Sequence, residues 1–140
     1  MDAEVRFVRP GVILATRHSP TAGEWLNCGK EVLETMQNET DAKGRRLEIH
    51  TIEEPDLVDL GALPDDEIVT SYVNCYFCNG GVIIPAFGSE KHDAKAKEIW
   101  QAVVPDREVR QVPLRTIPLS GGVIHCVTQQ VPAPKEAQGI

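Results

Sequence analysis

The chain repeats itself at an offset of 70 residues, and this repeat constrains the fold more than any other feature. The segments Phe7–Ala15 and Phe77–Pro85 share a phenylalanine, a turn glycine and a Val-Ile pair at equivalent positions. In both segments an apolar run precedes a Pro-Gly or Gly-Gly turn and another apolar run follows it. Two strand-forming runs joined by such a turn predict a β-hairpin.

Each predicted hairpin is followed by a helix and then by one more strand. The first helix is predicted from about residue 22 to 40, with Trp25, Val32, Leu33 and Met36 on one face, and the second from about 91 to 104. Alternating segments at 46–52 and 107–112 predict the closing strands. The sequence therefore predicts an α/β chain made of two ββαβ units, about 4–56 and 70–116, stacked or arranged radially. Residues 57–70 are predicted to form a loop, and 131–140 a mobile C-terminal tail.

Length and charge exclude several functional classes. The 140 residues suffice for one domain with a modest core, and the net charge of −7 disfavours a nucleic-acid partner. No apolar run is long enough to span a membrane, and the first residues do not resemble a signal peptide. Four cysteines without an export signal indicate a reducing compartment, so a cytoplasmic location is expected.

A single cysteine near the C-terminus is the first candidate for chemistry. Residues 120–130 read Ser-Gly-Gly-Val-Ile-His-Cys-Val-Thr-Gln-Gln. The β-branched residues predict a strand over 121–130, and the glycines Gly121 and Gly122 allow close approach to the backbone. Cys126 could there be a nucleophilic thiolate, although a buried structural cysteine is the commoner outcome for such a residue.

This segment resembles the nucleophile motif of the agmatine deiminase family, the bacterial-type peptidylarginine deiminase group. The family motif reads Gly-Gly-Gly-Asn-Ile-His-Cys-(Ile/Val)-Thr-Gln-Gln, and the chain departs from it at Ser120 and Val123. Residues 71–80 resemble the family's Ser-Tyr-x-Asn-Phe-Tyr-x-Ala-Asn-Gly segment, with Cys75 and Cys78 at two of its positions.

The N-terminal residues resemble the family's Gly-His-x-Asp-x-x-x-Arg-Phe-Val segment. Aligned on Arg6-Phe7-Val8, the family's guanidinium-binding aspartate falls on Asp2, and its acid/base histidine would stand directly before Met1. The resemblance implies that this chain is the C-terminal portion of such an enzyme and nearly inert by itself.

The resemblance further implies a fold and a reaction. The fold is a five-bladed α/β propeller of the pentein type, of which this chain would supply about two blades. The reaction converts agmatine to N-carbamoylputrescine and ammonia through a Cys126 thiouronium intermediate, in putrescine biosynthesis, with no cofactor and no metal. Asp2 would grip the guanidinium, Gly121 and Gly122 would support the site, and the uncovered blade surface favours homo-oligomers. Asp2 and Cys126 should then lie roughly 4–8 Å apart.

Other interpretations stay open at this point. The chain could be a non-catalytic remnant or binding module of the same fold, a peptidyl-arginine deiminase, or a redox protein that uses Cys75 and Cys78. Within a strand, residues three apart face opposite sides, so core packing is favoured for that pair. By the same rule His125 is predicted to pack behind the site, away from Cys126. We expect the side chains of Arg6, His18, His50 and His92 to have structural roles or to be exposed to solvent.

Overall fold

The structure, a computed structural model, describes residues 2–61 and 68–134 and confirms two ββαβ units. The first contains β1 (Val5–Arg9), β2 (Val12–Arg17), α1 (Glu24–Asn38) and β3 (Glu48–Glu53). The second contains β4 (Tyr76–Cys78), β5 (Gly81–Ala86), α2 (Glu90–Val103) and β6 (Glu108–Pro113). Three short 3₁₀ helices follow the units' strands, at Leu57–Leu60, Ile117–Ser120 and His125–Val127.

Each unit forms a three-stranded sheet with the same topology. The hairpin strands are antiparallel, and the closing strand pairs parallel to the second strand of the hairpin. In the order β1-β2-β3 the central strand is β2, and in β4-β5-β6 it is β5. The helix between the two parallel strands is the crossover that such a connection requires.

The two hairpins differ by one residue. Phe7 and Phe77 are 70 residues apart, whereas their partners Ile13 and Val82 are 69 apart. A bulge between Phe7 and Arg9 in the first hairpin accounts for the extra residue. The 70-residue offset therefore holds for β1 and β4, while β5 corresponds to β2 at an offset of 69.

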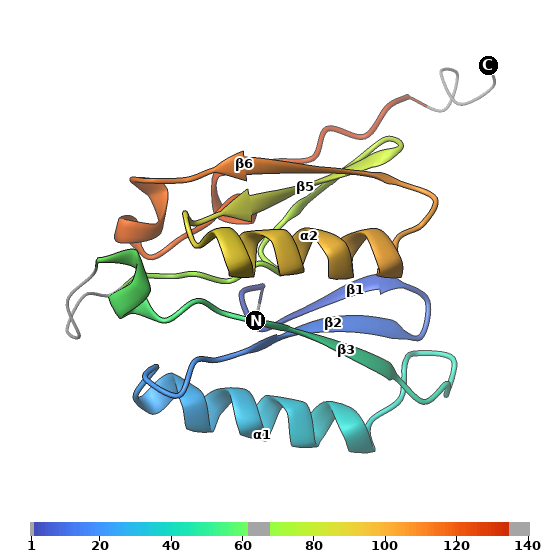
Figure 1. Ribbon diagram of the computed structural model, residues 1–140. Coiled ribbons are helices and arrows are strands. Elements are labelled where there is room, and N and C mark those ends of the chain that lie inside the picture. The colour runs from blue at the N-terminus through green and yellow to red at the C-terminus, as the bar shows by residue number, and fades with distance from the viewer. Residues whose placement is uncertain (1, 62–67, 135–140) are drawn as a thin grey trace.

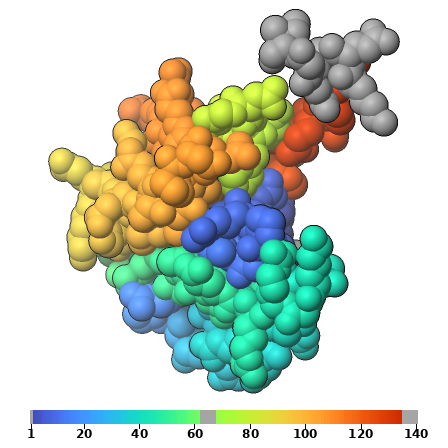
Figure 2. All heavy atoms as spheres, turned by 90° about the vertical axis from the view of Figure 1, so that its right-hand side faces the viewer, coloured from blue at the N-terminus to red at the C-terminus, as the bar shows by residue number. Residues whose placement is uncertain are grey.

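The elements stack as helix, sheet, helix, sheet, with α2 between the two sheets and α1 on the outer face of the first (Figure 1). The space-filling view shows the residues of the first unit below and those of the second unit above (Figure 2). The core lies around α2 and draws residues from both units. It contains Trp100, Ile84, Val82, Leu14, Ile52 and Tyr72.

The outer helix α1 is less buried than predicted. Val32, Leu33 and Met36 are half-buried, and Trp25 at the start of the helix is 64% exposed. The reason is that α1 contacts one sheet, whereas α2 is covered on two sides.

Asp93, in the first turn of α2, is the main polar junction of the second unit. Its carboxylate accepts hydrogen bonds from the Tyr72 hydroxyl at 2.7 Å and from the backbone N–H groups of Phe87 and Gly88 at 2.9 Å. It thereby joins the segment before β4 to the loop after β5.

Replacing Asp93 by alanine should lower the free energy of unfolding by about 1–3 kcal/mol, because three donors lose their acceptor. Urea denaturation followed by circular dichroism measures this. Glu90→Ala is the matched control, since Glu90 is an exposed carboxylate in the same helical turn and should change stability by about 0.5 kcal/mol or less. Equal losses in the two variants would mean that helix charge, and not the junction, sets the effect.

Candidate functional site

A pocket of about 580 Å³ opens where the two units meet. It is lined by the segment that precedes β1, by the loops that follow β2 and β3, and by the residues that precede β4. Gly121, Gly122 and Cys126 from the C-terminal segment complete its wall. The pocket is therefore built from segments that are far apart in the sequence.

The structure brings Asp2 and Cys126 together in this pocket. The Cys126 Sγ lies 3.7 Å from the Asp2 Oδ2, slightly less than the separation expected from the sequence. Asn74 bridges the two, because its Nδ2 lies 3.4 Å from each of these atoms. A thiol, a carboxylate and an amide thus share one corner of the pocket.

The segment around Cys126 is not a strand, and this part of the prediction was wrong. Residues His125–Val127 form a 3₁₀ turn, with the Val127 N–H donating to the Ile124 carbonyl at 3.3 Å. Val123 and Ile124 are buried as a strand residue would be, at 0% and 7% exposure. Instead of a neighbouring strand, however, the side chain of Asn74 accepts the His125 N–H at 2.8 Å. A side-chain acceptor and local turns replace the ladder that β propensity alone suggested.

His125 consequently faces the site, which corrects the prediction that it packs behind it. Its Nδ1 lies 2.9 Å from the Asp2 Oδ2. Successive residues differ by about 120° in a 3₁₀ helix and by about 180° in a strand, so His125 and Cys126 can both reach Asp2. The hydrogen bond from His125 holds the pKa of the Asp2 carboxyl below its usual range.

The glycine pair before Cys126 has two different roles in the backbone. Gly121 ends the preceding 3₁₀ helix at φ 75°, a left-handed conformation that favours glycine. A Cβ on Gly122 would lie 3.1 Å from the Cβ of Cys126, so this glycine lets the chain fold closely around the cysteine.

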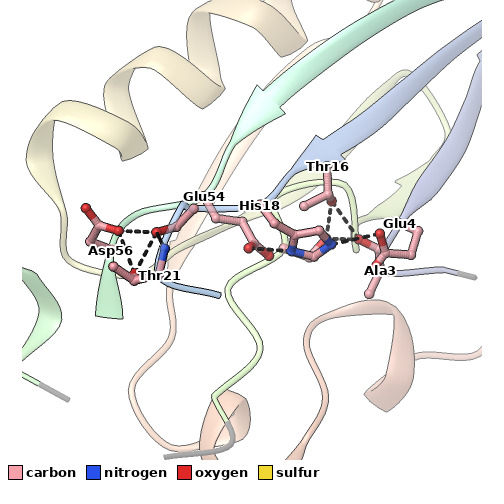
Figure 3. A network of polar contacts seen from close by, with 9 residues as sticks. Ala3, Glu4, Thr16, His18, Thr21, Glu54 and Asp56 are labelled. Atoms are coloured by element: carbon pink, nitrogen blue, oxygen red, sulfur yellow. Dashed lines mark hydrogen bonds and ion pairs between the residues drawn. The ribbon is translucent and has the colours of Figure 1, made fainter. Parts of the chain in front are cut away.

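The wall of the pocket also contains a buried ionic cluster that sequence reasoning missed. His18 directly follows β2, and its two ring nitrogens contact Glu4 and Glu54 at 2.9 and 2.8 Å (Figure 3). These two hydrogen bonds, that of Glu4 being the stronger cause, raise the pKa of His18 to about 10. Among the described residues that line the pocket, His18 is the only basic one, against the acidic Asp2, Glu4 and Glu54. The pocket therefore favours a cation.

Gly29 of α1 makes room for the His18 ring. A Cβ at this position would lie 2.4 Å from the His18 Cδ2, which is too close for two carbon atoms. Gly29→Ala should improve helix propensity by about 1 kcal/mol, yet we expect a net loss of about 1–3 kcal/mol in the free energy of unfolding. The ring is held by two carboxylates and has to move.

Thermal or urea unfolding measures this effect, and Asn27→Ala is the control. Asn27 is exposed on the same helix, so its replacement should gain the propensity without a clash. A stability gain in both variants would show that the His18 ring is free to shift.

The other residues named from the sequence lie outside the pocket. His50 contacts Glu48 on an exposed part of β3, and His92 contacts the Ser89 hydroxyl. Arg6 donates to the Cys75 carbonyl at 3.4 Å and lies over the Phe77 ring, which is a structural role.

The Cys75 and Cys78 pair does not form a paired redox site. Cys75 is fully buried and Cys78 is exposed. Burial raises the pKa of the Cys75 thiol to about 12. All four cysteines are free thiols, and within residues 2–61 and 68–134 no cluster of three or more side chains is suited to hold a metal ion. In that same part of the chain, no helix has the length and apolar character to cross a bilayer.

Asn74, unlike His18, carried a recognisable signal in the sequence. It lies inside the Ser-Tyr-x-Asn segment at 71–74, so the resemblance could have suggested a place near the site. Glu4 is the equivalent of Asn74 at the 70-residue offset, which means that both units place a polar residue at the entrance of the first strand. His18 and Glu54 show no local sequence pattern that would distinguish them from surface residues.

Comparisons with known proteins place the chain in a family. Residues 1–132 match the family described as Porphyromonas-type peptidyl-arginine deiminase. The agmatine deiminase of Pseudomonas aeruginosa is 43% identical over 147 residues, covering 94% of this chain and 39% of the relative. That of Pseudomonas fluorescens is 37% identical over 145 residues and covers 92% and 39%.

A solved structure shows the same fold. The agmatine deiminase of Enterococcus faecalis superposes with a TM-score of 0.79 at 28% identity, over 92% of this chain and 39% of that one. The chain thus spans about 40% of the length of the curated relatives it matches. With a match over residues 1–132 and a shared pentein-type fold, the chain belongs to the Porphyromonas-type peptidyl-arginine deiminase family.

Proposed function

We propose that this chain provides the nucleophile side of an agmatine deiminase-type hydrolase. The observation that carries the proposal is the contact of the Cys126 thiol with the Asp2 carboxylate and the Asn74 amide in an acidic pocket. Agmatine bears a planar guanidinium, which pairs with carboxylates through parallel N–H donors. The names of the relatives support agmatine as the substrate, and the family description supports peptidyl-arginine as the second candidate.

The reaction needs a thiolate, a carboxylate and a proton donor. The Cys126 thiolate attacks the guanidinium carbon and forms a C–S bond. A C–N bond then breaks and ammonia leaves with a proton given by the acid/base group, which produces a thiouronium. Water adds to the same carbon and gives one proton back to the acid/base group and one to the solvent, the C–S bond breaks, and the ureido product leaves with the thiolate restored. Asp2 holds the guanidinium, while the amide of Asn74 can donate to the sulfur.

The contact between Asp2 and Cys126 has to open for this reaction. Reacting atoms approach to about 3–3.5 Å, so a guanidinium carbon cannot lie between groups that are themselves 3.7 Å apart. Substrate binding therefore replaces the Asp2–Cys126 contact. The remaining carboxylates and the acid/base histidine belong, in this proposal, to the part of the relatives that the chain does not match. The complete protein would act in the cytoplasm, in putrescine biosynthesis, as a homo-oligomer.

A chimera tests the proposal. In the Pseudomonas aeruginosa relative, the matched segment is replaced by this chain, and ammonia release is measured with agmatine and with an arginine-containing peptide. We expect release from agmatine by the chimera and none by the 140-residue chain alone. Release from the peptide in preference to agmatine would favour the second substrate. A folded but inactive chimera would contradict the proposal and favour a non-catalytic module of the same fold.

A further inference from the structure

Three strand ends meet at one edge of the first sheet. Because β1 runs antiparallel to β2 and β3 runs parallel to it, the start of β1 lies beside the ends of β2 and β3. Glu4 directly precedes β1, His18 directly follows β2, and Glu54 directly follows β3. Since β2 is the central strand, its histidine stands between the two glutamates (Figure 3).

The cluster is closed and well shielded. The side chains of His18, Glu4 and Glu54 are 7%, 12% and 10% exposed. An imidazolium donates from both ring nitrogens, and both donors are used here, one for each carboxylate. Gly29 brings α1 against the ring, so the ring is also held from the helix side.

The contact with Glu4 fixes the backbone that leads to Asp2. The Thr16 N–H donates to the Glu4 carbonyl at 2.8 Å, and the hydroxyls of Thr16 and Ser71 each donate to the Ala3 carbonyl at 2.6 Å. The Glu4 side chain adds the bond to His18 at 2.9 Å. Asp2 directly precedes this anchored pair, so the position of its backbone depends on the contacts of Ala3 and Glu4.

We propose that His18 is a positioning residue, which holds Asp2 opposite Cys126 by binding Glu4. It does not touch the reacting atoms. Its importance for deimination rests on the proposed function. Its effect on the position of the Asp2 carboxylate does not, and that effect can be measured without turnover.

Two neutral substitutions separate the contacts of His18. In His18→Gln the amide can take the place of Nε2 and still donate to Glu4. In His18→Asn the shorter amide can take the place of Nδ1 and still donate to Glu54 alone. Both variants lose the charge, so a difference between them reports on the Glu4 contact.

The readout is the ratio of two alkylation rates at the Cys126 thiol of the 140-residue chain. Cationic 2-bromoethylamine is compared with neutral iodoacetamide, and the modified peptides are quantified by mass spectrometry. A carboxylate about 4 Å from the thiol should favour the cation about fivefold in water. Cys28 and Cys78 are also exposed thiols and serve as internal references. Asp2→Asn gives the ratio without the carboxylate.

We expect the ratio of alkylation rates in His18→Gln to stay within about twofold of that in the unchanged chain. In His18→Asn the ratio should fall about fivefold, to the value measured for Asp2→Asn. Equal ratios in the two His18 variants, whether high or low, would overturn the proposal. Assays are run below the unfolding transition of each variant. If His18→Asn fails to fold, Glu4→Ala removes the same contact and should show the same fall, and an unchanged ratio there would overturn the proposal. An inactive chimera in the ammonia assay would refute the proposed function and leave this result unaffected.

Discussion

Cys126→Ala in the chimera should reduce ammonia release from agmatine at least about 10³-fold, because the covalent intermediate of the proposed reaction forms on the Cys126 sulfur. The sulfur is exposed in the pocket and lies within 3.4–3.7 Å of the Asn74 amide and the Asp2 carboxylate. Ammonia release at saturating agmatine, with protein concentrations matched, measures the effect. The loss should appear in kcat, since the thiol is needed for bond formation more than for binding.

Two other cysteines provide the controls. Cys78→Ala removes an exposed thiol outside the pocket and should leave ammonia release within about twofold. Cys75→Ala removes a fully buried thiol and should lower stability more than rate. If Cys126→Ala retained activity, or if Cys78→Ala abolished it with the fold intact, Cys126 would not be the nucleophile.

The second large effect is a loss of stability at alkaline pH. In the folded chain the pKa of His18 is raised from 6.5 to about 10 by the hydrogen bonds to Glu4 and Glu54. Between these values the folded state holds a proton that the unfolded state has released, so raising the pH favours unfolding. The stabilisation by charged His18 is complete below about pH 6.5 and is lost progressively as the pH rises from there to about 10. The expected slope is about 1.4 kcal/mol per pH unit, with a total of up to roughly 4–5 kcal/mol.

Urea denaturation at pH 7, 8 and 9 measures the slope. His18→Gln, which cannot titrate, should show no such slope in this range. The range ends at pH 9 because burial raises the pKa of the Cys75 thiol from 9.0 to about 12, so that a second loss of stability begins there. Identical slopes in the two proteins would show that His18 is not charged in the folded chain.

Much of the fold follows from local sequence patterns. Both helices begin and end within about two residues of the predicted bounds, and the closing strands are shifted by one or two residues. Turn residues, alternation and helical spacing act over short stretches, so they can be read without knowing the fold. The bulge before Arg9 was not predicted, because its effect on register appears only when the two hairpins are compared.

The C-terminal segment shows where local patterns fail. Val123, Ile124 and Val127 favour a strand, but a strand also needs a partner edge, and Asn74 satisfies the His125 N–H instead. The backbone therefore turns, and His125 reaches Asp2. A residue 51 positions away decided this conformation, and β propensity is known to yield to such contexts.

The sequence by itself determined the two ββαβ units, the motif that contains Cys126 and its relation to the deiminase motifs, because each depends on residues that are close together in the chain. The resemblance had already suggested that Asp2 lies near Cys126. Only the tertiary structure decided that Asn74 and His125 join them in one corner, and that His18 stands between two glutamates. Strand order and direction bring these residues together from segments up to 124 positions apart. The spacing of residues along the chain does not show which of them become neighbours in space until the sheets have formed.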